Sequence, residues 1–151
     1  MAKRKALKLE INIDNINDNF KVDTDNIEHL VNYVLNKENY KFGDIGIVFV
    51  NHNYIIELNK KFLGKNETTD VLSFSLDETS KPEISGEVYI NLDIVSENAI
   101  EFNVSFVEEV NRMVIHGLLH LAGYDDQTDS DKAIMTRRED LYLEDYEKDL
   151  Q

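Results

Sequence analysis

The stretch SFVEEVNRMVIHGLLHLAGYDD, residues 105–126, decides the fold of this chain. Ser105 is followed three residues later by Glu108, the spacing of a capping box at the start of a helix. Apolar residues then recur at helical spacing around most of the circumference, which predicts a buried helix. Gly123 suits the C′ position, where a positive φ angle costs glycine little. We therefore predict a buried helix that begins after Ser105 and ends at Gly123.

Shorter elements are predicted around this helix. Alternating or continuous apolar residues indicate four strands, over about 7–13, 45–50, 71–76 and 87–92. Helical spacing indicates further helices over about 24–39, over 55–62 with an end near Gly64, over 93–101, and from 128–131 onward. Residues 12–19 are rich in Asn and Asp, which indicates a loop.

The order of the elements is β-α-β-α-β-β followed by three helices. The first two β-α steps favour parallel, right-handed crossovers, and the last two strands favour an antiparallel pair. These features predict an α+β fold, a small mixed β-sheet of about four strands with about five helices packed on it. The length of 151 residues fits a single domain, 1–151.

Composition limits the functional classes. The chain has no Cys, which excludes disulfides and thiolate metal sites. Residues 1–8 are basic but lack the apolar run of a signal peptide, and no stretch approaches the roughly 18 apolar residues of a membrane span. We therefore expect a soluble, cytoplasmic protein without a membrane partner. The formal net charge of −14 argues against nonspecific, charge-driven binding of nucleic acid.

The end of the predicted core helix carries candidate metal ligands. His116 and His120 are four residues apart, so both imidazoles lie on one helix face. Gly123 lets the chain turn back, and Asp126 can then offer an oxygen to the same ion; its neighbour Asp125 is the alternative. Three nitrogen and oxygen ligands leave a fourth position for water, the arrangement of a catalytic zinc site. The spacing alone also permits a hydrogen-bonded pair of core histidines.

The His-x3-His-x5-ligand spacing also occurs in metzincin proteases. Those enzymes carry Glu directly after the first His as the general base. Here that position is Gly117, which cannot accept a proton. A metalloprotease of that type is therefore disfavoured, although the zinc geometry is not.

The motif resembles a known family. Residues 116–126 are similar to the signature His-Gly-x-Leu-His-Leu-x-Gly-Tyr-Asp-His of the YbeY family of bacterial endoribonucleases. Residues 59–74, in which Lys65 precedes Thr-Asp-Val-Leu-Ser-Phe, and residues 86–90 resemble two further family motifs. Two positions depart from the pattern. Asp126 stands where the family commonly has His, and Leu63 stands where it commonly has Arg.

The resemblance implies one Zn²⁺ per chain on His116, His120 and Asp126. It implies a single-strand-specific endoribonuclease that matures rRNA, notably the small-subunit 3′ end, and acts in ribosome quality control. The expected partners are single-stranded RNA and the ribosome or its small subunit, and no DNA. No general base is named, and Lys65, Ser73 and Arg112 are candidates for catalytic support. The alternatives are a noncatalytic zinc-stabilised ribosome-assembly or RNA-binding factor and a zinc hydrolase of another substrate.

Overall fold

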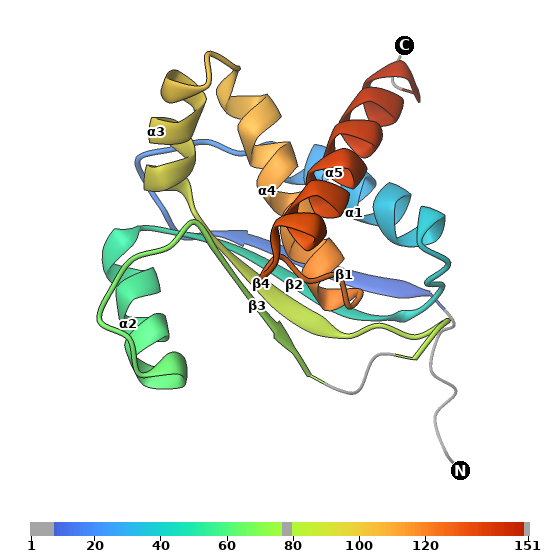
Figure 1. The fold of residues 1–151 in the computed structure, drawn as a ribbon, viewed down its shortest axis with the longest axis horizontal. Helices are drawn as coiled ribbons and strands as arrows, with labels where there is room; N and C mark the ends of the chain where they lie inside the picture. Colours follow the sequence, from blue (N-terminus) through green and yellow to red (C-terminus); the bar gives the residue numbers. More distant parts are fainter. Residues whose placement is uncertain (1–7, 77–79, 150–151) are drawn as a thin grey trace.

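The fold is a four-stranded sheet with helices on both of its faces (Figure 1). The structure, a computed structural model, describes residues 8–76 and 80–149. In chain order the elements are β1 (Leu9–Asn15), α1 (Thr24–Lys37), β2 (Gly43–Val50), α2 (His52–Leu63), β3 (Val71–Ser75), β4 (Gly86–Asn91), α3 (Leu92–Glu101), α4 (Phe106–Leu121) and α5 (Asp129–Asp149). The predicted α+β class is confirmed. None of the helices among the described residues is long and apolar enough to cross a membrane.

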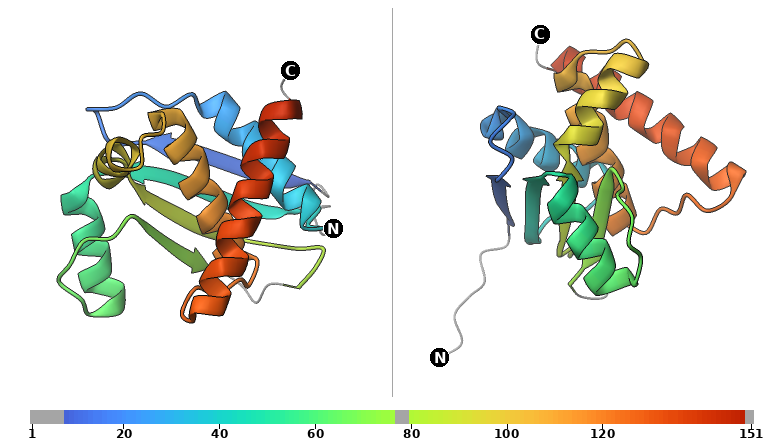
Figure 2. Two further views of the ribbon diagram at one scale, coloured as in Figure 1. Left: turned by 45° about the horizontal axis from the view of Figure 1, so that its top comes forward. Right: turned by 90° about the vertical axis from the view of Figure 1, so that its left-hand side faces the viewer.

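The sheet has the strand order β1-β2-β4-β3. β1 pairs with β2 and β2 with β4 in parallel, whereas β3 and β4 are antiparallel, as predicted for the last two strands. The predicted parallel crossover from β2 to β3 is wrong, because β3 is an edge strand that pairs antiparallel with β4, and β4 itself runs parallel to β2. The cause is the connection: α2 leads back along the sheet, and the extended segment 64–70 then returns to the end from which α2 started (Figure 2).

The first strand ends two residues later than its sequence indicates. The predicted start, Leu7, lies outside the described residues, and the strand continues through Asn15. The loop expected from Asn12 onward is therefore wrong in its first four positions. Asn12 and Asp14 are polar because they alternate with half-buried residues and face solvent, not because the strand has ended.

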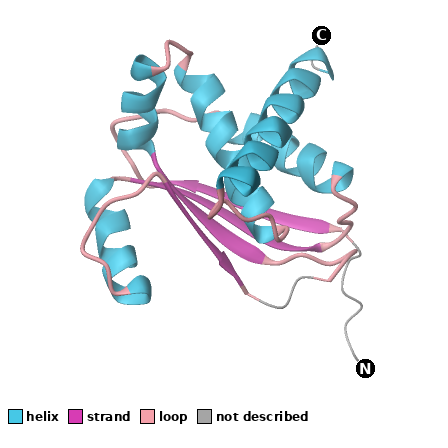
Figure 3. Ribbon diagram, in the orientation of Figure 1, coloured by secondary structure: helices cyan, strands magenta, loops and turns pink. Residues whose placement is uncertain are grey.

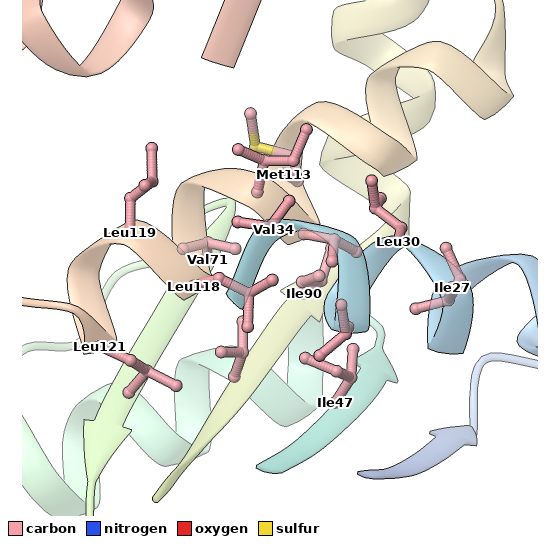
Figure 4. Packing of buried hydrophobic residues seen from close by; sticks show 14 of the residues in the cluster. Ile27, Leu30, Val34, Ile47, Val71, Ile90, Met113, Leu118, Leu119 and Leu121 are labelled. Atoms are coloured by element: carbon pink, nitrogen blue, oxygen red, sulfur yellow. The ribbon is translucent and has the colours of Figure 1, made fainter. Parts of the chain in front are cut away.

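Helix α4 lies at the centre of the hydrophobic core. Ser105 is its N-cap, and its hydroxyl accepts a hydrogen bond from the Glu108 N–H (3.0 Å). Leu118 projects from α4 toward the sheet, near Val71 of β3 and Ile90 of β4 (Figure 4). The predicted position of the helix and its buried character are confirmed.

Close contact between α4 and the sheet depends on a glycine. A Cβ atom at Gly117 would lie 2.3 Å from Cγ1 of Val88 on β4. The Ser73 hydroxyl of β3 donates to the Gly117 carbonyl oxygen (3.1 Å). Gly117 therefore brings the helix backbone directly onto the strands, and this contact fixes the neighbouring residue His116.

Candidate metal centre

Three side chains converge where α4 ends. His116 and His120 lie on the last two turns of α4, and Asp126 lies on the loop between α4 and α5 (Figure 3). The two histidine Nε2 atoms are 3.1 Å apart. Oδ2 of Asp126 is 3.3 Å from Nε2 of His120 and 3.5 Å from Nε2 of His116. The three predicted ligands thus form one group of potential metal-binding atoms.

The spacing of these atoms fits a small tetrahedral ion. Zinc bonds to nitrogen and oxygen of about 2.0–2.1 Å place tetrahedral ligand atoms about 3.3–3.4 Å apart. The three observed separations, from 3.1 to 3.5 Å, bracket that value. Two imidazole nitrogens and one carboxylate oxygen are also the ligand types that zinc accepts. Over the described ranges, no fourth His, Asp or Glu joins this group.

His116 is oriented by a buried carboxylate on α5. Its Nδ1 donates to Oε2 of Glu139 (2.7 Å), and only 7% of the Glu139 side chain is exposed. Because a carboxylate accepts and does not donate, this bond places the ring proton on Nδ1 and leaves the Nε2 lone pair free for a metal. Arg112 donates to Oε1 of Glu139 (3.2 Å) and to Oδ1 of Asp140 (2.7 Å), so it holds the carboxylate in turn.

The acidic surroundings change the basicity of His116. Burial disfavours the imidazolium and is the largest effect, but the hydrogen bond and charge of Glu139 oppose it, together with the charges of Asp70 and Asp126. The net result raises the pKa of His116. The group therefore attracts positive charge, either as a proton or as a metal ion.

Asp126 rather than Asp125 faces the histidines. Gly123 takes a φ of 97° and its N–H donates to the His120 carbonyl (3.0 Å), which ends the helix as predicted. Asp125 uses Oδ1 to accept a hydrogen bond from the backbone N–H of Asp126 (2.8 Å). Asp125 therefore shapes the turn, while the Asp126 carboxylate joins the two imidazoles.

A groove opens beside the three ligands. His120 and Asp126 line it together with Leu63, at the end of α2, and Ser73. Lys65 is exposed and is not among the lining residues. Arg112 lines a different cavity, with Glu139 and Asp140. Of the three candidates for catalytic support, the structure therefore places only Ser73 in the groove.

The sequence contains a signal that Glu139 is buried. Met135, Tyr142 and Tyr146 are buried and recur at helical spacing along α5, and Glu139 falls on the same stripe. A carboxylate on a buried stripe needs a partner, because an isolated buried charge is costly. That partner is His116.

Comparison with known proteins identifies the family. The sequence model of the family described as "Endoribonuclease YbeY" matches residues 12–147. This chain belongs to the YbeY family. The YbeY of Flavobacterium psychrophilum is 42% identical over 113 residues, covering 75% of this chain and 79% of the relative. The YbeY of Chlorobaculum tepidum is 38% identical over 122 residues, covering 81% and 88%. Both relatives are named "Endoribonuclease YbeY".

A solved structure has the same fold. The solution structure of a protein from Thermotoga maritima matches with a TM-score of 0.65 and 36% sequence identity. The match covers 89% of this chain and 87% of the other. The similarity therefore extends well beyond the histidine motif, to the sheet and most of the helices.

Proposed function

We propose that this chain is a zinc-dependent endoribonuclease that cleaves single-stranded RNA. The observation that carries the proposal is the triangle of His116, His120 and Asp126 atoms, which is spaced for one tetrahedral ion and has two members, His120 and Asp126, lining an open groove. Membership of a family named for its endoribonuclease activity supports RNA as the substrate. The open groove beside the ligands favours a catalytic role over a purely structural one, because structural zinc sites use four protein ligands.

Each residue of the centre has a defined task. When bound, zinc supplies Lewis-acid polarisation of a phosphate oxygen and makes water more acidic. His116 and His120 bind through Nε2, and Glu139 keeps the His116 ring in the required tautomer. Asp126 contributes one negative charge where a histidine would contribute none, which reduces the net positive charge that substrate meets. Ser73 in the groove is a candidate for contact with the RNA backbone.

Recognition of RNA by an acidic chain requires local positive charge. Lys60, Lys61 and Lys65 are exposed at the end of α2, on either side of Leu63, which lines the groove. Leucine cannot contact phosphate ionically, so we assign the phosphate contacts to these lysines. A basic segment beside the groove can attract RNA even though the net charge is −14.

The biological role follows from the family. We propose that the RNA is rRNA, that the reaction matures the 3′ end of the small-subunit RNA, and that the enzyme acts in ribosome quality control. The ribosome or its small subunit is then the partner, and the cytoplasm the site of action. The family relationship supports these assignments.

A cleavage assay tests the proposal. Purified protein is incubated with a single-stranded RNA and with the same sequence as a duplex, before and after chelation, and zinc is then added back. We expect cleavage of the single strand only, its loss on chelation and its return with zinc. Equal cleavage by chelated protein or by the His120→Ala variant would contradict a metal-dependent reaction. Stoichiometric zinc without any cleavage would instead favour the noncatalytic assembly factor.

A further inference from the structure

The third ligand of the centre depends on a loop. His116 and His120 are fixed by their helix, but Asp126 lies beyond its end, and 38% of its side chain is exposed. The backbone bonds near the helix end involve Gly123 and Tyr124, whose N–H groups donate to the carbonyls of His120 and Leu119. Tyr124, two residues before Asp126, also holds this loop through its side chain.

Tyr124 connects this loop to a buried carboxylate at the C-terminal end of α1. Its hydroxyl donates to Oε1 of Glu38 (2.8 Å). Glu38 is the C-cap of α1, and only 4% of its side chain is exposed. The contact spans 86 residues of sequence and links the end of α1 to the loop that carries Asp126.

Two residues of α5 complete the cluster around Glu38. The Tyr142 hydroxyl donates to Oε2 of Glu38. Arg138 donates from Nε to the Tyr124 hydroxyl oxygen (3.0 Å), and its Nη2 lies 3.6 Å from Oε2 of Glu38. Tyr124 thus donates to one member of the cluster and accepts from another, which determines where its ring lies. We name Glu38, Tyr124, Arg138 and Tyr142 the Glu38 cluster.

A second contact holds the same segment. The Tyr40 hydroxyl, a few residues after Glu38, donates to the carbonyl oxygen of Ala122 (3.4 Å). Burial and the Glu38 carboxylate raise the pKa of the Tyr142 hydroxyl, so this group remains a donor at neutral pH. Buried ionic groups are weak evidence of stability in themselves, because well-packed apolar replacements are often as stable. A positioning role gives the cluster a specific use.

We propose that Glu38 is a positioning residue for the metal centre, holding the loop through Tyr124 so that the Asp126 carboxylate stays within ligand distance of the two histidines. The inference rests on the proposed metal site but not on the identity of the substrate. Two buried carboxylates then support different ligands of the centre: Glu139 orients His116, and Glu38 positions Asp126. Partners that orient metal ligands contribute about 10–100-fold in metal affinity.

The test measures zinc affinity by competition with a chromophoric chelator. Glu38→Gln removes the charge, and Tyr124→Phe removes only the hydroxyl that reaches it. We expect each variant to bind zinc about tenfold more weakly than the wild type. Tyr146→Phe is the matched control, because its hydroxyl also joins α5 to α1, but at Asn26 near the start of α1, the opposite end from Glu38. Its zinc affinity is expected to equal that of the wild type.

A double-variant comparison separates positioning from general stability. In an Asp126→Ala background the ligand to be positioned is gone, so adding Tyr124→Phe is expected to leave zinc affinity unchanged. Wild-type affinity in both Glu38→Gln and Tyr124→Phe would overturn the inference, as would an equal loss with and without Asp126. Because zinc affinity is the readout, a failure to cleave RNA would contradict the proposed activity without affecting this result.

Discussion

The helix half and the loop half of the candidate metal centre are held by different means. His116 and His120 belong to α4, which Gly117 brings into direct contact with Val88 of the sheet. Asp126 belongs to a loop, and the Glu38 cluster connects that loop to α1 and α5. The histidine positions therefore follow from the packing of the core, whereas the aspartate position depends on a separate set of polar contacts.

This difference explains where a ligand can change. A substitution at position 126 alters the charge of the site without repacking the core, since the side chain is partly exposed. A substitution on the α4 side would disturb residues that pack against β3 and β4. The departure of this chain from the common family residue, aspartate for histidine, falls in the loop half.

The largest effect is expected from removing the helix half. His116→Ala or His120→Ala leaves two of three ligands, and we expect the bound zinc, about one ion per chain in a site of this type, to be lost. Elemental analysis of the purified variants measures this directly. His29→Ala is the control, because His29 is exposed on α1 and outside the ligand group. Undiminished zinc in a variant that carries both substitutions would contradict the assignment of these histidines as metal ligands.

The second largest effect is expected from adding atoms to the close contact between Gly117 of α4 and Val88 of β4. Gly117→Ala places a Cβ atom 2.3 Å from Val88 Cγ1. We expect the free energy of unfolding to fall by roughly 1–3 kcal/mol, the usual cost of forcing extra atoms into a packed core. Urea unfolding measures it. Gly46→Ala provides the comparison, because its Cβ would meet nothing closer than 3.6 Å. Equal stability of the two variants would show that α4 can move away from the sheet.

A smaller effect is expected from changing Glu139, the carboxylate that orients His116 in the helix half. Glu139→Gln keeps the shape of the side chain but removes the charge that accepts the Nδ1 proton. We expect zinc affinity to fall by about 10–100-fold, as for other partners of metal-bound histidines. Glu144→Gln, at an exposed position of the same helix, should have no effect. Zinc competition titrations that give equal affinities for both variants would exclude Glu139 from the centre.

Changing the ligand of the loop half should alter chemistry more than binding. Asp126→His restores the common family residue and removes a negative charge beside the ion. Zinc should be retained, and the pH at which RNA cleavage rises should shift downward, because less negative charge favours loss of a proton. A pH–rate profile of wild type and variant measures the shift. A profile that does not move, or moves upward, would contradict this electrostatic account.

The smallest effect is expected outside both halves. Changing Lys60, Lys61 or Lys65 to Ala removes one exposed charge beside the groove and should leave zinc binding unchanged. Each true phosphate contact contributes about 0.7 to the slope of log affinity against log salt on a single strand. Titration of single-stranded RNA across salt concentrations measures that slope. If all three variants retain the affinity and slope of the wild type, the RNA is held elsewhere.

Local patterns in the sequence were sufficient for much of the fold and for the ligand group. The capping box at Ser105, the turn at Gly123 and the spacing of His116 and His120 all depend on residues close in sequence. The direction of β3 was predicted wrongly because it depends on the path of segment 64–70, which carries no periodic signal.

The partners of Glu139 and Glu38 were beyond local reasoning. Glu139 contacts a residue 23 positions away, and Glu38 contacts residues 86 and 104 positions away. Glu38 ends a helix, where an exposed acid is the ordinary expectation, and no nearby residue indicates that it is buried. Such partners become visible only when α1, α4 and α5 are brought together.

A crystal structure of the zinc-loaded protein tests the central claim most directly. We expect one ion bonded to Nε2 of His116, Nε2 of His120 and an oxygen of Asp126, each at about 2.0–2.2 Å. The fourth coordination position of the ion should be open to the groove. An ion bound elsewhere, or one whose fourth position is filled by a further protein side chain, would contradict it.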